Sequence, residues 1–149
     1  MELEGKWGYI DKTGKFIVNP RFDYAWPFSE GLAAVMIEGK CGYIDETGRY
    51  VVNPQFDYAW SFSEELAEVQ LGGELGYIDR TGNNIVKPRF DGAGPFSEGL
   101  ARVELGGKWG YIDKTGKFIM NPQFDGAGDF KEGMAIIQVS DKWGYLTIR

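Results

Sequence analysis

Apolar and polar residues alternate with a period of two along several short stretches of the chain. In residues 33–37, and in three later stretches of the same kind, one set of alternate positions keeps small or apolar side chains. The positions between them vary and include Glu68 and Arg102. One buried face and one mostly wet face are typical of an antiparallel β-strand. The alternation therefore predicts an all-β protein.

A five-residue motif recurs every 34 residues without insertion or deletion. It reads Trp-Gly-Tyr-Ile-Asp at residues 7–11, and its later copies begin at residues 41, 75, 109 and 143. Residues 5–38 and 107–140 are identical at 22 of 34 positions. This regularity predicts one repeat domain over residues 1–149. Its four periods are 5–38, 39–72, 73–106 and 107–140, with partial caps at 1–4 and 141–149.

The period of 34 residues also occurs in helix-pair repeats, but the local chemistry opposes helices. Each period has several glycines and a central proline, and these residues cost a helix interior about 1 and 3 kcal/mol respectively. The prolines are Pro20, Pro54, Pro88 and Pro122. The repeat is therefore interpreted as β-structure.

Three strands are predicted in the first period, at residues 7–11, 15–18 and 32–37. Asp-Lys-Thr-Gly at residues 11–14 has the composition of a tight hairpin turn. In the 13-residue connection at 19–31, two phenylalanines are expected to reach the core. A single meander is too small to be stable. The fold is therefore predicted as an open stack of three-stranded antiparallel β-meanders, with a closed propeller-like ring as the alternative.

The tryptophan of the motif is replaced in two of the five copies. Cys41 and Leu75 stand at its position, which favours an apolar packing slot over a specific indole contact. Cys41 is then expected to be a buried, inert thiol. The glycine that follows, Gly8 in the first copy, is expected to let a neighbouring aromatic ring pass close to the strand.

Composition and charge exclude several classes of function. The chain has no histidine, one cysteine and a net charge of −6, which opposes imidazole catalysis, Cys/His zinc sites and nucleic-acid binding. No cofactor and no metal are expected. No apolar run is long enough to cross a membrane, and the acidic start is unlike a signal peptide. The default expectation is a cytoplasmic protein with no membrane partner.

Most acidic residues recur once per period, which favours structural roles. Asp11 is expected to cap its turn, Asp23 to bond amides in the connection, and Glu30 to precede a turn. The rival interpretations are a paired-carboxylate hydrolase or a calcium site. An enzyme would need one carboxylate that differs from its repeats, such as Glu65.

Four aromatic residues break the symmetry of the array. Tyr24, Trp26, Tyr58 and Trp60 lie in the first two connections, and the last two connections have glycines at the same positions. Emptying an aromatic slot in a core costs about 3–5 kcal/mol, so these rings are candidates for a partly exposed binding stripe. The alternative is that they cover a wider gap between the first units. The period that contains Tyr58 and Trp60 is the most acidic, at −4.

The repeated sequence resembles the bacterial WG (KWG) repeat family. The resemblance rests on Gly-Lys-Trp-Gly-Tyr-Ile-Asp-Lys-Thr-Gly-Lys, followed by Pro-x-Phe-Asp-x-Ala-x-x-Phe-Ser-Glu-Gly-Leu-Ala. It covers essentially the whole chain and recurs four times. The family consists of tandem β-repeats without a general activity, so the resemblance implies a fold and a bacterial source and no catalytic residue.

These observations favour a non-enzymatic binding or scaffolding module for protein–protein or peptide interaction, with Tyr24, Trp26, Tyr58 and Trp60 as the ligand-binding residues. One alternative is a carbohydrate-binding module that uses the same rings. The others are a purely structural spacer and an engineered repeat protein. The chain is expected to be a monomer or a weak end-to-end oligomer.

Overall fold

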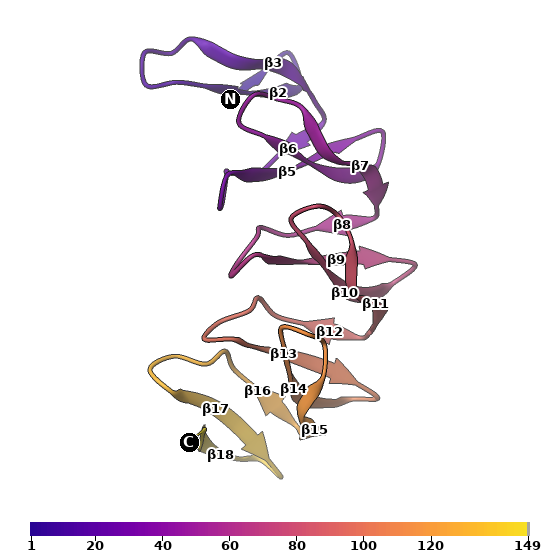
Figure 1. Cartoon of the computed structure of the whole chain (residues 1–149), viewed down its shortest axis with the longest axis vertical. Helices are drawn as coiled ribbons and strands as arrows, with labels where there is room; N and C mark the ends of the chain where they lie inside the picture. The colour runs from indigo at the N-terminus through magenta and orange to yellow at the C-terminus, as the bar shows by residue number, and fades with distance from the viewer. Residues whose placement is uncertain (149) are drawn as a thin grey trace.

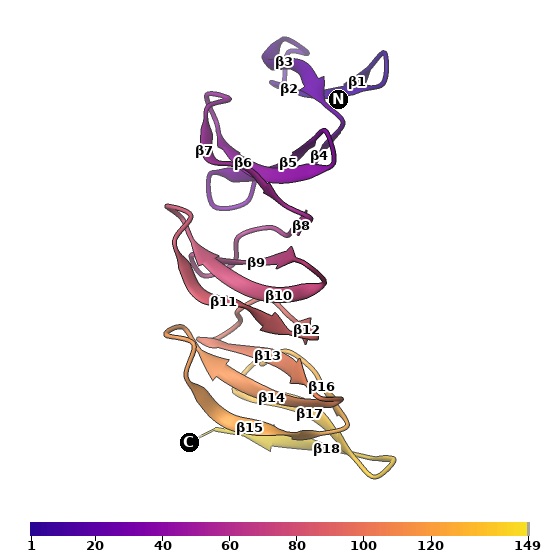
Figure 2. The ribbon, with the colours of Figure 1, turned by 90° about the vertical axis from the view of Figure 1, so that its right-hand side faces the viewer.

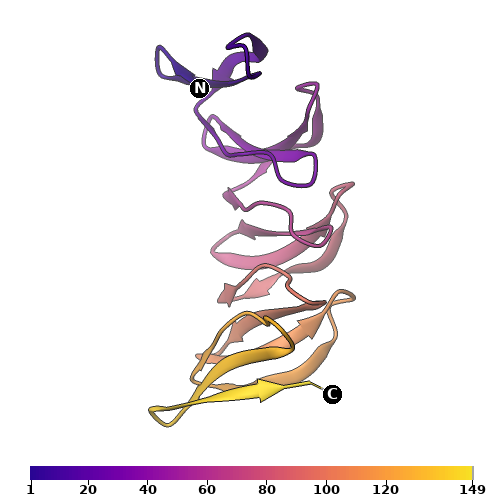
Figure 3. The ribbon, with the colours of Figure 1, turned by 90° about the vertical axis from the view of Figure 1, so that its left-hand side faces the viewer.

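The computed structural model describes residues 1–148 as a column of five small antiparallel sheets. The sheets follow one another in chain order along the column, and the two ends of the chain lie at opposite ends of it (Figure 1). Views from either side show the sheets stacked face to face (Figures 2 and 3). The prediction of an open, all-β stack is confirmed, and the closed ring does not form.

The strands of each sheet are consecutive in the sequence. The first sheet contains β1 (Glu2–Leu3), β2 (Lys6–Ile10) and β3 (Phe16–Phe22). The second contains β4 (Tyr24–Ala25), β5 (Leu32–Ile37), β6 (Lys40–Asp45) and β7 (Tyr50–Phe56). The third contains β8 (Tyr58–Ala59), β9 (Leu66–Leu71), β10 (Glu74–Asp79) and β11 (Asn84–Phe90). The fourth contains β12 (Gly92–Ala93), β13 (Leu100–Leu105), β14 (Lys108–Asp113) and β15 (Phe118–Phe124). The fifth contains β16 (Gly126–Ala127), β17 (Met134–Val139) and β18 (Lys142–Thr147).

The connections are more ordered than the predicted loops. Each of the later sheets gains a two-residue strand at its edge; in the second sheet, Tyr24 pairs with Met36 and Ala25 with Val35. The strand that follows the hairpin also extends through its proline, as β3 does through Pro20. A proline is tolerated there because the strand lies at a sheet edge. In the three inner sheets, the predicted three-stranded meander is therefore extended by a short fourth strand.

The core is divided into four clusters, one at each interface between successive sheets. Between the second and third sheets, Tyr43 and Phe56 from one side meet Ala67, Val69 and Ile78 from the other. Both faces of an inner sheet are therefore covered. The expectation that one face of each strand is mostly wet is wrong, because the variable positions face the next sheet of the stack.

Both phenylalanines of each connection reach the core, as predicted, and the second of them packs on the preceding sheet. Phe62 packs against Tyr43 with ring centroids 4.9 Å apart, and the same contact recurs at the other interfaces. The tyrosine hydroxyl then donates to a backbone carbonyl of the following sheet; Tyr77 donates to Gly94 at 2.6 Å. Each interface thus combines an aromatic contact with a tyrosine hydrogen bond, and the two together fix the spacing of the sheets.

The glycine after the motif's tryptophan has a different role from the expected one. A Cβ atom on Gly42 would lie 2.4 Å from the carbonyl oxygen of Val52, on the adjacent strand. Gly8, Gly76 and Gly110 have the same contact in their own sheets. The close neighbour is therefore the backbone of the bulged partner strand, and not an aromatic ring.

The hairpin turns are built as the sequence predicts. In the first of them, one Asp11 oxygen accepts hydrogen bonds from the amides of Thr13 and Lys15 and from the Thr13 hydroxyl. Gly14 has a φ of 87°, a conformation that favours glycine. These hydrogen bonds hold the pKa of the Asp11 carboxyl below its usual value.

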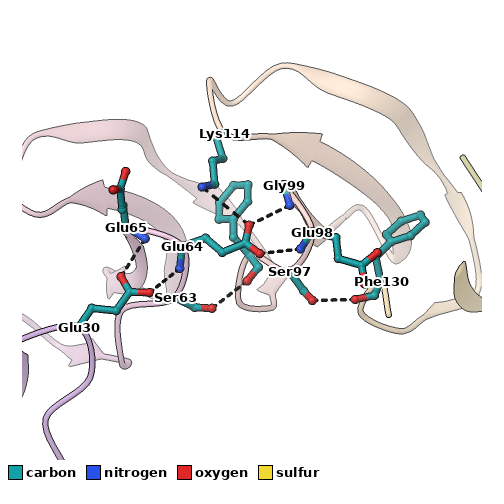
Figure 4. Close-up of polar contacts among 10 residues, drawn as sticks. Glu30, Ser63, Glu64, Glu65, Ser97, Glu98, Gly99, Lys114 and Phe130 are labelled. Carbon is teal, nitrogen blue, oxygen red and sulfur yellow. Dashed lines mark hydrogen bonds and ion pairs between the residues drawn. The ribbon is translucent and has the colours of Figure 1, made fainter. Parts of the chain in front are cut away.

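A ladder of glutamates links the connections of successive repeats (Figure 4). The two carboxylate oxygens of Glu64 accept hydrogen bonds from the amides of Glu98 and Gly99, at 2.6 and 2.8 Å. Glu30 and Glu98 make the same pair of bonds one repeat earlier and one later. Each glutamate is therefore an acceptor for the next repeat, a role that its position before a turn did not predict.

Removing one step of this ladder should weaken one interface. We expect Glu98→Ala to lower the free energy of unfolding by about 1 kcal/mol, because two amides lose their acceptor. Urea denaturation followed by circular dichroism measures the change. Glu132→Ala is the matched control: its φ of 52° is close to the 54° of Glu98, and it has no following repeat within residues 1–148. Equal losses for the two variants would contradict a bonding role.

Candidate functional site

The four candidate residues form two aromatic pairs on successive sheets. Tyr24 and Trp26 lie at the edge of the second sheet, with ring centroids 6.0 Å apart and ring planes at 31°. Tyr58 and Trp60 repeat this arrangement on the third sheet, at 5.9 Å and 33°. The sequence therefore identified residues that the fold brings together in pairs.

Three of the four rings are substantially open to solvent. Tyr24 is 57% exposed, Tyr58 52% and Trp60 41%. Trp26 is half-buried and packs with Met36 against the core between the second and third sheets. The pair on the third sheet is thus the more accessible one.

The backbone under each pair is fixed from two sides. In the third sheet the amide of Trp60 donates to the carbonyl of Glu68. The carbonyl of Trp60 accepts a hydrogen bond from the hydroxyl of Tyr43, in the sheet before. The rings therefore stand on rigid backbone, which lowers the entropic cost of presenting them to a partner.

The replacement of tyrosine by glycine at these positions is coupled to the residue at the motif's tryptophan position in the same sheet. In the second and third sheets Tyr24 and Tyr58 accompany Cys41 and Leu75, which are small at that position. In the fourth sheet the relation is reversed: a Cβ atom on Gly92 would lie 3.0 Å from the Trp109 ring. The glycine positions are therefore not empty slots, since a tryptophan from the same sheet fills the space.

The space beside Gly94, the second glycine of this connection, is also filled. A Cβ atom on Gly94 would lie 2.7 Å from Nε of Arg102. The Arg102 guanidinium lies 5.0 Å above the Trp109 ring, and its Nε donates to Asp129 at 3.0 Å. A cation between an aromatic ring and a carboxylate thus stands where the third sheet has Trp60.

Glu68 is the buried acid of the third sheet and the counterpart of Arg102. It is 5% exposed and lies beside Tyr77 on the neighbouring strand. Its Oε1 has no hydrogen-bond partner within residues 1–148. Burial raises the pKa of the Glu68 carboxyl to about 7, with a smaller opposing effect from Arg102. Sequence reasoning missed this residue because it assigned its position to a wet face.

The acid that differs from its repeats, Glu65, lies in the turn just before β9, the strand that contains Glu68. It has a φ of 73° where the other repeats have glycine, which is a strained conformation for this residue. It lines an open cleft of about 380 Å³ together with Glu64, Asp79, Arg80 and Lys114. Glu64 and Asp79 already accept backbone hydrogen bonds. The cleft therefore holds one uncommitted carboxylate, whereas a paired-carboxylate mechanism needs two.

The structure also bears on the cysteine, on metal binding and on membrane-spanning helices. Cys41 is a free, buried thiol, as predicted. Its pKa is raised, chiefly by burial. Within residues 1–148 no group of three or more acidic or cysteine side chains is arranged to hold a metal ion. No helix in the same residues has the length and apolar character to span a membrane.

Comparisons with known proteins identify the repeat. One solved structure that resembles the chain is a plant lectin with two metal-binding sites from Cicer arietinum, with 13% sequence identity over 87% of each chain. Its TM-score of 0.35 is too low to support conclusions about this protein. A search of curated proteins found no match. The family model for the WG containing repeat matches four consecutive segments, at residues 7–41, 42–74, 76–109 and 109–143. The matched segments cover most of the chain, which therefore belongs to the WG repeat family.

Proposed function

We propose that this chain is a non-enzymatic binding module whose protein or peptide partner contacts the aromatic pairs Tyr24–Trp26 and Tyr58–Trp60. The observation that carries the proposal is the exposure of both pairs on a rigid stack. Tyrosine and tryptophan are enriched among the residues that contribute most to protein interfaces. They also lose little conformational entropy when they become buried.

The geometry of the pairs favours peptide side chains over sugar rings. The ring planes within the pairs are tilted by 31° and 33°, so neither pair offers one flat platform. An apolar or cationic side chain needs only the face of one ring. Carbohydrate binding through the same rings is the alternative that the experiment must separate.

The direct test compares peptide binding by three tryptophan variants. We expect the protein to bind a subset of an array of dodecapeptides and to leave cellohexaose unbound. Trp60→Ala should weaken binding to the selected peptides at least tenfold, because truncating a central interface tryptophan costs more than about 1.4 kcal/mol. Trp26→Ala should have a smaller effect, since its ring is already half-buried. Isothermal titration calorimetry with one selected peptide measures the affinities.

Trp143→Ala is the control for loss of an exposed indole away from the pairs. Trp143 is 65% exposed on the last sheet and should be replaceable without effect on peptide affinity. Saturable binding of cellohexaose through the pairs would favour the carbohydrate alternative. Absence of binding to every peptide, or binding that neither Trp26→Ala nor Trp60→Ala changes, would reject the proposal.

A further inference from the structure

The fourth sheet contains an intramolecular cation site. Arg102 lies over the Trp109 ring and donates to Asp129, which holds the guanidinium between a π-face and a carboxylate. Both components of this arrangement stabilise a cation: the ring through its quadrupole and the carboxylate through a charge-assisted hydrogen bond. The arrangement shows that this row of the sheet can accommodate an arginine side chain.

In the third sheet, Trp60 and Glu68 stand at the positions that Gly94 and Arg102 occupy in the fourth, so an aromatic ring and a carboxyl group replace the arginine. Trp60 and Tyr58 provide exposed rings, and Glu68, directly across the strand pair from Trp60, provides the carboxyl group. Side chains opposite one another on paired strands lie on the same face, about 5 Å apart at Cβ. Oε1 of Glu68 has no partner within residues 1–148, although buried oxygens in proteins are nearly always hydrogen-bonded.

We propose that Trp60, Tyr58 and Glu68 form a receptor for one arginine side chain of a protein partner. The guanidinium stacks against the Trp60 ring and donates a hydrogen bond to Glu68, as Arg102 does with Trp109 and Asp129. The inference rests on the proposed function, because it assigns the chemistry of the partner to one of the two aromatic pairs.

Access to the carboxyl group requires the Trp60 indole to turn outward. The ring is 41% exposed, so part of its surface already faces solvent. Its backbone stays in place through the hydrogen bonds of the Trp60 amide and carbonyl. The backbone therefore does not need to move when the indole rotates.

Charge supports a cationic guest at this pair. The period from 39 to 72 has a net charge of −4, the most negative of the four, and attracts cationic segments at a distance. The pair on the second sheet has nearly the same ring geometry, but Ala34 stands where the third sheet has Glu68. Arginine selectivity is therefore expected at Trp60 and not at Trp26.

The experiment uses a dodecapeptide of glycine and serine with one central arginine, and the same peptide with citrulline in its place. Citrulline keeps the shape of arginine but has no charge. We expect the arginine peptide to shift the Trp60 indole signal in ¹⁵N-correlated NMR spectra and to bind at least tenfold more tightly than the citrulline peptide. Glu68→Gln should remove that difference. Glu46→Gln, which deletes an exposed charge of the same period, should preserve it.

The outcomes separate this inference from the proposed function. Equal affinity of wild type and Glu68→Gln for the arginine peptide, with loss in Trp60→Ala, would overturn the arginine receptor and leave the aromatic binding site standing. The same holds if the citrulline and arginine peptides bind alike. If Trp60→Ala binds both peptides as tightly as wild type does, the arginine receptor and the proposed function are both rejected.

Discussion

Replacing Gly42 by alanine should destabilise the protein by about 3 kcal/mol or more. The added Cβ atom would lie 2.4 Å from the carbonyl oxygen of Val52 and 2.7 Å from the nitrogen of Pro54. Both atoms belong to backbone, so no side-chain rotation relieves the overlap, and β6 must separate from β7. Overpacking of this kind costs up to a few kcal/mol even where flexible side chains can move.

Gly144→Ala is the matched control for this prediction. Gly144 stands at the same position of the motif in the last sheet, and a Cβ atom there has no heavy atom within 4 Å. We expect its midpoint of thermal unfolding to stay within about 2 °C of wild type, because surface substitutions away from special features change stability little. A similar loss in both variants would show that glycine is needed for its flexibility and not for the close approach.

Stability should fall as the pH rises from about 5 to 8, and Glu68 should be the cause. Burial raises its pKa from an ordinary value of 4.5 to about 7 in the folded protein, so the folded state retains a proton that the unfolded state has lost. The free energy of unfolding therefore decreases across this interval, by at most about 3 kcal/mol. The charged and titratable groups around Glu68 are Arg102, Asp129, Tyr77 and Tyr43.

Urea denaturation of wild type and Glu68→Gln at pH 5, 6, 7 and 8 measures this effect. We expect the variant to be nearly independent of pH in this range and to be the more stable protein at pH 8. The lowered pKa values of turn carboxylates such as Asp11 and Asp45 affect stability only at more acidic pH. Parallel pH profiles for the two proteins would exclude Glu68 as the titrating group.

The sequence predicted the features of the fold that depend on neighbouring residues. The Asp-x-Thr-Gly turn and the spacing of the motif were enough to place the hairpins and the stack. The short strand at Tyr24–Ala25 was missed because two residues carry no periodicity; its pairing with Val35 and Met36 depends on the path of the connection. The role of Glu64 was missed because its acceptor function spans a full repeat.

The candidate site was only partly predictable for a related reason. The rings were found because Tyr24, Trp26 and their counterparts break the repeat. The partner substitution was hidden in the same alignment, because the period that contains Gly92 has Leu75 at the motif's tryptophan position and Trp109 belongs to the next period. Only the sheet register places Gly92 and Trp109 together. Glu68 could be recognised as buried only once both faces of its sheet were known to be covered.

Every interface in the stack joins two different surfaces: the face of one sheet that carries the motif's tyrosine, and the opposite face of the sheet that follows. Tyr145 is 70% exposed on the last sheet, whereas its counterparts Tyr43, Tyr77 and Tyr111 are fully buried by the sheet that follows. The last sheet thus presents the tyrosine on which each inner sheet receives the next one. Duplication of a segment that spans one whole sheet would therefore lengthen the column, and its deletion would shorten it equally simply.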